Sequence, residues 1–118
     1  MLDDELDITT VIITLLRKNG FNVVGFTNPF LALEHFQMNF KDYSIILSDI
    51  RMPGMNGFEF VKKSREIKPE VKVLLMTAFD INTDIVSEGL LPTKVNGLIQ
   101  KPVSSNELNS IIRKHISI

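Results

Sequence analysis

The chain has 118 residues, and its 13 lysines and arginines nearly balance its 14 aspartates and glutamates, for a net charge of −1. This balance gives no electrostatic reason to expect direct binding to nucleic acid or to an anionic membrane. The absence of cysteine excludes disulfides, thiol chemistry and zinc–thiolate sites. No apolar run approaches the ~18 residues of a membrane span, and the acidic N-terminus does not resemble a signal peptide. We therefore expect one cytoplasmic domain over residues 1–118.

The first half of the chain alternates between helical and strand-like patterns. Apolar residues recur at helical spacing in the first segment, and Asn28-Pro29 is typical of a helix N-cap followed by proline in the first turn. A continuous β-prone run then indicates a strand buried on both faces. The elements predicted here are a helix over 5–18, a strand over 21–26, a helix from Pro29 onward and a strand over 43–47 that ends at Ser48-Asp49.

The second half continues this alternation. Its elements are a helix over about 57–67, a strand over 71–76 that ends at Thr77, a helix over 81–91, a strand over 97–100 that ends at Lys101-Pro102, and a helix opened by a capping box at Ser104 and Glu107. Strands that alternate with helices predict an α/β fold, in which a parallel sheet carries helices on both faces through right-handed crossovers.

Polar residues follow the predicted strands at the points where the strands end. Asp49, Thr77 and Lys101 each come directly after an apolar strand run. The carboxyl ends of parallel strands meet at one edge of the sheet, where open α/β sheets bind their ligands. Asp3 and Asp4 precede the first helix, so they join this edge if a strand comes before them.

Three carboxylates in one place repel one another, so the cluster needs a cation or must take up protons. Oxygen ligands with positions left for water suit Mg²⁺, with Mn²⁺ as a substitute. A carboxylate in such a site, Asp49, can attack a phosphoryl group and form an aspartyl phosphate. Lys101 and the metal would neutralise the phosphoryl oxygens during in-line transfer, and Thr77 would add a hydrogen bond.

Four motifs in this order resemble those of the receiver domains of response regulators in two-component signalling, including the chemotaxis-regulator type. They are Asp3-Asp4-Glu5, Asp49 with Met52-Pro53-Gly54-Met55-Asn56-Gly57, Met76-Thr77-Ala78, and Lys101-Pro102. The resemblance runs from Asp3 to the last helix. It implies a flavodoxin-like, doubly wound sheet with strand order 2-1-3-4-5.

The resemblance also implies a role for each site residue. Asp49 would be the phosphoacceptor, Thr77 and Lys101 would contact the phosphoryl group, and Mg²⁺ would be held by Asp3, Asp4, Asp49 and the backbone carbonyl of Arg51. The implied partners are a sensor histidine kinase or phosphotransfer protein and an output partner that the sequence does not identify. A phosphorylation-dependent homodimer stays open.

The sequence departs from the family pattern at two places. Most of the first strand is missing, because only Met1 and Leu2 precede the acidic pair. A late gene start, tag residues outside this numbering or a strand from another chain are the open explanations. Leu98 stands where the family usually has an aromatic switch residue, so we expect the response to phosphorylation mainly in residues 79–96.

Three other functions compete with a phosphorylated switch. A phosphohydrolase of the haloacid-dehalogenase type also uses a nucleophilic aspartate, but Asp49-Ile50-Arg51 lacks the second acid that those enzymes need. A nucleotide-binding module has no glycine-rich phosphate motif here. The third alternative is a receiver-like module that binds partners without phosphorylation.

Overall fold

The computed structural model describes residues 1–77, 95–101 and 104–116. Its sheet contains three parallel strands in the order β1-β2-β3: β1 (Ile45–Asp49), β2 (Lys72–Thr77) and β3 (Gly97–Gln100). The three strands predicted in these regions are confirmed, with β1 starting two residues later and extending through Asp49. The helix predicted over 81–91 lies outside the described residues.

The helices begin where their sequence signals predict. They are α1 (Leu6–Lys18), α2 (Pro29–Asn39), followed by a short 3-10 helix η1 (Phe40–Asp42), α3 (Gly57–Ile67) and α4 (Ser105–Ile116). The Asn28 side chain accepts hydrogen bonds from the first amides of α2. The Ser104 hydroxyl accepts one from the amide of Glu107. Both caps satisfy amides that have no partner inside their helix.

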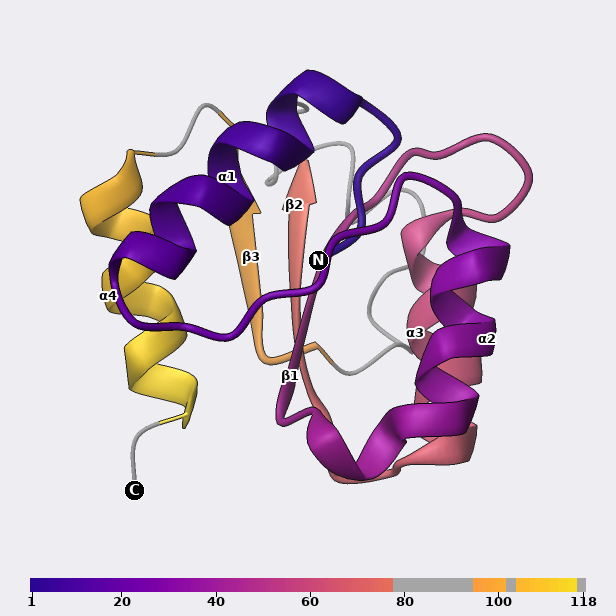
Figure 1. The fold of residues 1–118 in the computed structure, drawn as a ribbon. Helices are drawn as coiled ribbons and strands as arrows, with labels where there is room; N and C mark the ends of the chain where they lie inside the picture. The colour runs from indigo at the N-terminus through magenta and orange to yellow at the C-terminus, as the bar shows by residue number, and fades with distance from the viewer. Residues whose placement is uncertain (78–94, 102–103, 117–118) are drawn as a thin grey trace.

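The helices form two layers around the sheet, as Figure 1 shows, with α1 and α4 on one face and α2 and α3 on the other. Side chains alternate between the two faces along each strand. In β1, Ile46 packs into the core under α2 and α3, whereas Leu47 packs into the core under α1 and α4. Both faces of the strands are therefore covered, and this explains their continuous apolar sequences.

The buried face of α1 is not the face on which the sequence pattern places its apolar residues. Leu6 is 66% exposed and Val11 is 58% exposed, while Thr9 and Leu16 are buried. A polar residue can occupy the inner face because the Thr9 hydroxyl donates hydrogen bonds to the backbone carbonyls of Asp3 and Glu5. The helix is therefore oriented by this polar contact as well as by apolar burial.

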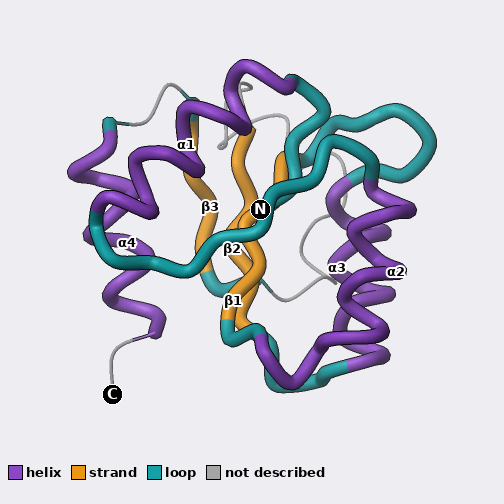
Figure 2. Tube along the Cα trace, in the orientation of Figure 1, coloured by secondary structure: helices purple, strands orange, loops and turns teal. Residues whose placement is uncertain are grey.

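The prediction of a regular strand over 21–26 is wrong. Residues 21–25 are extended loop (Figure 2), and only Phe26 pairs, through an isolated parallel bridge to Leu2. Leu2 also bridges Ser48 of β1. The lateral order is thus Phe26, Leu2, β1, β2, β3, which is the expected 2-1-3-4-5 order with its first two strands reduced to single bridges. Among the described residues no strand pairs with 21–25, and Met1 reaches this segment through a single hydrogen bond from its nitrogen to the Val24 carbonyl.

Gly57 begins α3 where the helix meets the end of β1. A Cβ at this position would lie 2.5 Å from the backbone oxygen of Asp49 and 2.9 Å from the Cα of Ile50. Only a residue without a side chain allows α3 to start this close to Asp49.

We predict that Gly57→Ala lowers the stability by about 1–3 kcal/mol, because the contacted atoms are backbone atoms that cannot rotate away. Gly97→Ala is the matched control, since its Cβ would meet mainly the movable side chains of Leu74 and His115. Urea unfolding of both variants measures the difference. Equal losses would show that the backbone contact at Gly57 is not special.

Candidate functional site

Asp49 is the last residue of β1 and is held there by backbone contacts on both sides. Its amide donates to the Leu2 carbonyl at 2.8 Å, and the next amide, that of Ile50, continues the ladder by donating to the Met76 carbonyl at 3.0 Å. The Ile50 amide also lies 3.0 Å from Asp49 Oδ1. The carboxylate is therefore fixed at the carboxyl edge of the sheet, with 11% of the side chain exposed.

Asp3 reaches the same edge because Leu2 pairs on both sides. The amide of Asp3 donates to the Phe26 carbonyl at 3.1 Å, and its side chain is fully buried. Asp3 Oδ1 accepts from the amide of Glu5 at 3.0 Å. The pairing of Leu2 on both sides thus places this carboxylate beside β1.

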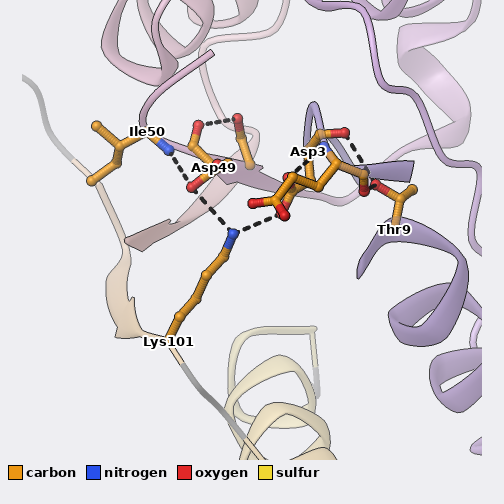
Figure 3. A network of polar contacts seen from close by, with 7 residues as sticks. Asp3, Thr9, Asp49, Ile50 and Lys101 are labelled. Carbon is orange, nitrogen blue, oxygen red and sulfur yellow. Dashed lines mark hydrogen bonds and ion pairs between the residues drawn. The ribbon is translucent and has the colours of Figure 1, made fainter. Parts of the chain in front are cut away.

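Lys101 joins the two carboxylates (Figure 3). Its Nζ lies 2.8 Å from Asp3 Oδ2 and 3.5 Å from Asp49 Oδ1. Lys101 follows β3, and its backbone amide donates to the carbonyl of Thr77 at 2.7 Å. The ends of β2 and β3 are therefore tied together at the point from which the ammonium reaches across to β1.

The charges in this site are not balanced, because one ammonium faces two carboxylates. Burial raises the pKa of Asp49; Lys101 opposes this rise and Asp3 adds to it, with a net value of about 6. Burial lowers the pKa of Lys101, but its hydrogen bond to Asp3 and the charges of both aspartates outweigh burial and raise it. The site therefore keeps its ammonium and holds Asp49 near the point of protonation at neutral pH.

Asp4 adds a third carboxylate to the group. One oxygen from each of Asp3, Asp4 and Asp49 lies within 4.8 Å of the others, although Asp4 itself is exposed. A cluster of hard oxygen donors that is open to solvent on one side fits a divalent cation that keeps several waters. The pKa of Asp49 is raised mainly by burial, which the Lys101 ammonium only partly offsets, so an added cation would stabilise the ionised carboxylate.

Thr77 and Arg51 lie at or just after the ends of the neighbouring strands β2 and β1. Thr77 ends β2 and is 2% exposed, and Arg51 lies two residues after Asp49 in the loop that leads to α3. Leu98 lies in β3 and packs against the core under α2 and α3. Most of the segment 79–96, where we expect the response to phosphorylation, lies outside the described residues.

Sequence reasoning missed the residues that support Asp3. Thr9 binds the Asp3 carbonyl at 3.1 Å from one turn into α1, and the Glu5 amide binds the carboxylate. The signal was a threonine, Thr9, at a buried position of α1. A buried hydroxyl needs a hydrogen-bond acceptor, which here belongs to the site.

The sequence matches the family model of the response regulator receiver domain over residues 1–113. It is 33% identical over 79 residues to the response regulator receiver protein CpdR of Brucella abortus, covering 67% of this chain and 64% of that protein. It is 33% identical over 108 residues to the transcriptional regulatory protein ZraR of Klebsiella oxytoca, covering 92% of this chain and 24% of that protein. The chain thus spans between a quarter and two thirds of the length of these relatives.

Solved structures share the fold. The receiver domain protein of Clostridium thermocellum superposes with a TM-score of 0.86 at 24% identity, covering 98% of this chain and 90% of the other. The chemotaxis protein CheY4 of Vibrio cholerae gives 0.86 at 24% identity, covering 98% and 94%. The receiver domain of the sensor histidine kinase PA1611 of Pseudomonas aeruginosa, solved with magnesium in its active site cleft, gives 0.84 at 24% identity, covering 99% and 95%.

The doubly wound sheet, with carboxylates, a threonine and a lysine at one edge, defines a receiver domain. The chain belongs to the response regulator receiver family. Receiver domains are signalling modules of two-component systems rather than conventional enzymes, and they interact with histidine kinases or phosphotransfer proteins and with output domains. Family membership decides against the phosphohydrolase and nucleotide-binding interpretations. In the described part of the chain, no helix is long and apolar enough to cross a bilayer.

We predict that Asp49→Asn stabilises the metal-free protein at neutral pH. The carboxyl group has a pKa of about 6 in the folded protein and an ordinary value of 3.8, so keeping it ionised in the folded state costs free energy above pH 6. Asparagine removes this cost while its side-chain oxygen still accepts from the Ile50 amide. The stability gained by Asp49→Asn should be full above about pH 6 and should fade as the pH falls toward 4.

Thermal unfolding from pH 4 to 8 in the presence of a chelator measures this gain, which we expect to be a few degrees. Asp42→Asn, at an exposed position in η1, is the control. A gain that is independent of pH, or one that the Asp42 variant shares, would contradict the assigned pKa.

Proposed function

We propose that Asp49 accepts the phosphoryl group in this receiver domain. The observation that carries the proposal is the position of its carboxylate, which is fixed at the end of β1, reaches solvent and lies 3.5 Å from the Lys101 ammonium. Asp3 is unsuited to this role, because its side chain is fully buried and both its oxygens accept hydrogen bonds. Asp4 is exposed.

In the proposed reaction a carboxylate oxygen of Asp49 bonds to phosphorus while the bond from phosphorus to the donor breaks. With a phosphohistidine donor the broken bond is P–N, and its electron pair and a proton remain with the imidazole. The product is an acyl phosphate. Small phosphodonors would react in the same way, and water attack on phosphorus would return Asp49 to the free acid.

Asp3, Asp4 and Asp49 are the side chains that would hold Mg²⁺ or Mn²⁺, together with the backbone carbonyl of Arg51. The PA1611 receiver domain supports this assignment, because its structure contains magnesium in the active site cleft. The bound cation would supply positive charge against the phosphoryl oxygens. Mg²⁺ usually keeps several bound waters. It therefore suits this site better than a cation bound only by protein ligands, because Asp4 leaves one side of the cluster open to water.

Lys101 and Thr77 would respond to the new phosphoryl group. Lys101 is held by Asp3 at 2.8 Å and by Asp49 at 3.5 Å, and phosphorylation adds negatively charged oxygens on the Asp49 side. The ammonium should therefore move toward them. Because the Lys101 amide is bonded to the Thr77 carbonyl, such a move acts on the ends of β2 and β3 together and would change a partner-binding surface.

We further propose that residues 1–118 act as one phosphoacceptor domain within a two-component phosphorelay. A sensor histidine kinase or a phosphotransfer protein would be the donor. The response regulators ZraR and CpdR support a regulatory output, although the chain matches only part of each.

We predict that a small acyl phosphate donor, with Mg²⁺ in the buffer, adds one phosphoryl group to the wild-type protein and none to Asp49→Asn. The adduct should be cleaved by hydroxylamine, because it is an acyl phosphate. Intact-mass spectrometry and peptide mapping make the measurement, and Asp42→Asn should react like the wild type.

The other outcomes identify the alternatives. A phosphoryl group that persists in Asp49→Asn places the acceptor elsewhere. A wild-type protein that stays unmodified, while its aspartate cluster binds Mg²⁺, would instead support the receiver-like module that acts without phosphorylation.

A further inference from the structure

Three threonines lie in α1, and one of them differs from the other two. Thr9, Thr10 and Thr14 each donate a hydroxyl hydrogen bond to the carbonyl four residues earlier, at 2.8–2.9 Å. Thr10 and Thr14 are exposed, and their acceptors belong to α1 itself. Thr9 is 3% exposed, and its hydroxyl also lies 3.1 Å from the carbonyl oxygen of Asp3, outside the helix (Figure 3). The single hydroxyl proton is therefore shared between the carbonyls of Glu5 and Asp3.

Packing holds the Thr9 side chain in the orientation that makes this contact. Its methyl group lies against Gly25, where an added Cβ would come within 3.2 Å of Thr9 Cγ2. A β-branched side chain has few allowed rotamers in a helix, so the methyl contact on one side keeps the hydroxyl on the side of Asp3. The hydroxyl is therefore directed at the acidic segment by apolar packing behind it.

The turn that leads from Asp3 into α1 depends on this hydroxyl. Within the described residues, the side chain of the N-cap residue, Glu5, caps no amide of α1. Two bonds to Asp3 hold the turn: the Glu5 amide donates to Oδ1 at 3.0 Å, and the Thr9 hydroxyl donates to the carbonyl oxygen at 3.1 Å. One bond fixes the carboxylate, and the other fixes the backbone that carries it.

The Asp3 carbonyl also affects Asp4. It belongs to the planar peptide that joins the two residues, so the bond from Thr9 sets the direction in which the chain enters Asp4. Asp3, Asp4 and Asp49 each offer a carboxylate oxygen within 4.8 Å of the others, and a rotation of this peptide would move the Asp4 oxygen relative to the other two. The spacing of the cluster therefore depends on a residue that is not a member of it.

We propose that Thr9 is a positioning residue for the aspartate cluster, and that its hydroxyl sets the affinity of the cluster for a divalent cation by fixing the peptide between Asp3 and Asp4. This role rests on the cation binding proposed above for the aspartates and does not require Thr9 to touch the cation. Replacing a residue that holds metal ligands in place typically costs about 10- to 100-fold in metal affinity.

Two substitutions in the full chain separate the hydroxyl from the methyl group. Thr9→Val keeps the shape but removes the donor, so we expect it to weaken Mg²⁺ binding by about tenfold. Thr9→Ser keeps the donor but loses the methyl contact with Gly25, so it should lower the unfolding midpoint while its Mg²⁺ affinity stays within about twofold of the wild type. Thr10→Val is the matched control, because it removes the equivalent bond to Leu6 on the exposed side of α1, and its affinity should equal that of the wild type. Amide NMR shifts in a titration with MgCl₂, below the unfolding midpoint of each variant, measure the affinities.

The wild-type protein gives a second measurement that needs no variant. Coupling between two interactions is reciprocal, so if the hydroxyl strengthens cation binding, Mg²⁺ must strengthen the hydroxyl bond by the same factor. Exchange of the Thr9 hydroxyl proton with solvent, followed by NMR, should therefore slow by about tenfold at saturating Mg²⁺ relative to NaCl of equal ionic strength.

The outcomes distinguish the role of Thr9 from the cation site itself. Full affinity in Thr9→Val, an equal loss in Thr9→Ser or in Thr10→Val, or hydroxyl exchange that Mg²⁺ does not slow would overturn the role of Thr9 and leave the cation site in place. A folded wild-type protein that does not bind Mg²⁺ would contradict the cation site, and the role of Thr9 with it.

Discussion

The ion pairs of Lys101 with Asp3 and Asp49 are the interaction on which the rest of the site depends. They bring together the N-terminal segment at Asp3, the end of β1 and the end of β3, which are far apart in the sequence. Burial, which Lys101 only partly offsets and to which Asp3 adds, gives Asp49 a pKa of about 6, so added positive charge would stabilise the ionised site. A divalent cation would supply this charge, and a phosphoryl group would change the charge of the site. The chemistry therefore follows from a charge imbalance that the fold maintains.

The backbone maintains this imbalance by fixing each charge separately. Asp49 is positioned by Leu2, and Asp3 is positioned by Phe26 and Thr9. The Lys101 amide is bonded to Thr77, so the ammonium is anchored to two strands. None of these hydrogen bonds uses the carboxylate oxygens of Asp49. This carboxylate can therefore bind a cation or a phosphoryl group while the surrounding backbone stays in place. A change at Lys101 can then pass to the ends of β2 and β3.

Helix starts and the meeting of Asp49, Thr77 and Lys101 at one edge could be predicted from sequence, because strand runs, caps and terminal polar residues are local signals, whereas the strand order came from the family resemblance. The reduction of the predicted strand over 21–26 to one bridge at Phe26 could not be predicted, since pairing depends on a neighbouring strand, which in the described residues is the short segment at Leu2. The inward position of Thr9 was also missed, because hydrophobic periodicity gives no weight to a hydroxyl that bonds the backbone of Asp3. Likewise, the pairing of Lys101 with Asp3 at 2.8 Å, shorter than its 3.5 Å contact with Asp49, depends on three-dimensional distances that no motif contains.

The central claim is that the carboxylate cluster has unmet negative charge that a divalent cation neutralises. Carbon-detected NMR of the aspartate carboxyl groups, as a function of pH with and without saturating Mg²⁺, tests it most directly. We expect the pKa of Asp49 to be about 6 without the cation and to fall by about 2 units or more with it. An Asp49 pKa that is unchanged by Mg²⁺, or one that already lies near 4 in its absence, would contradict the account.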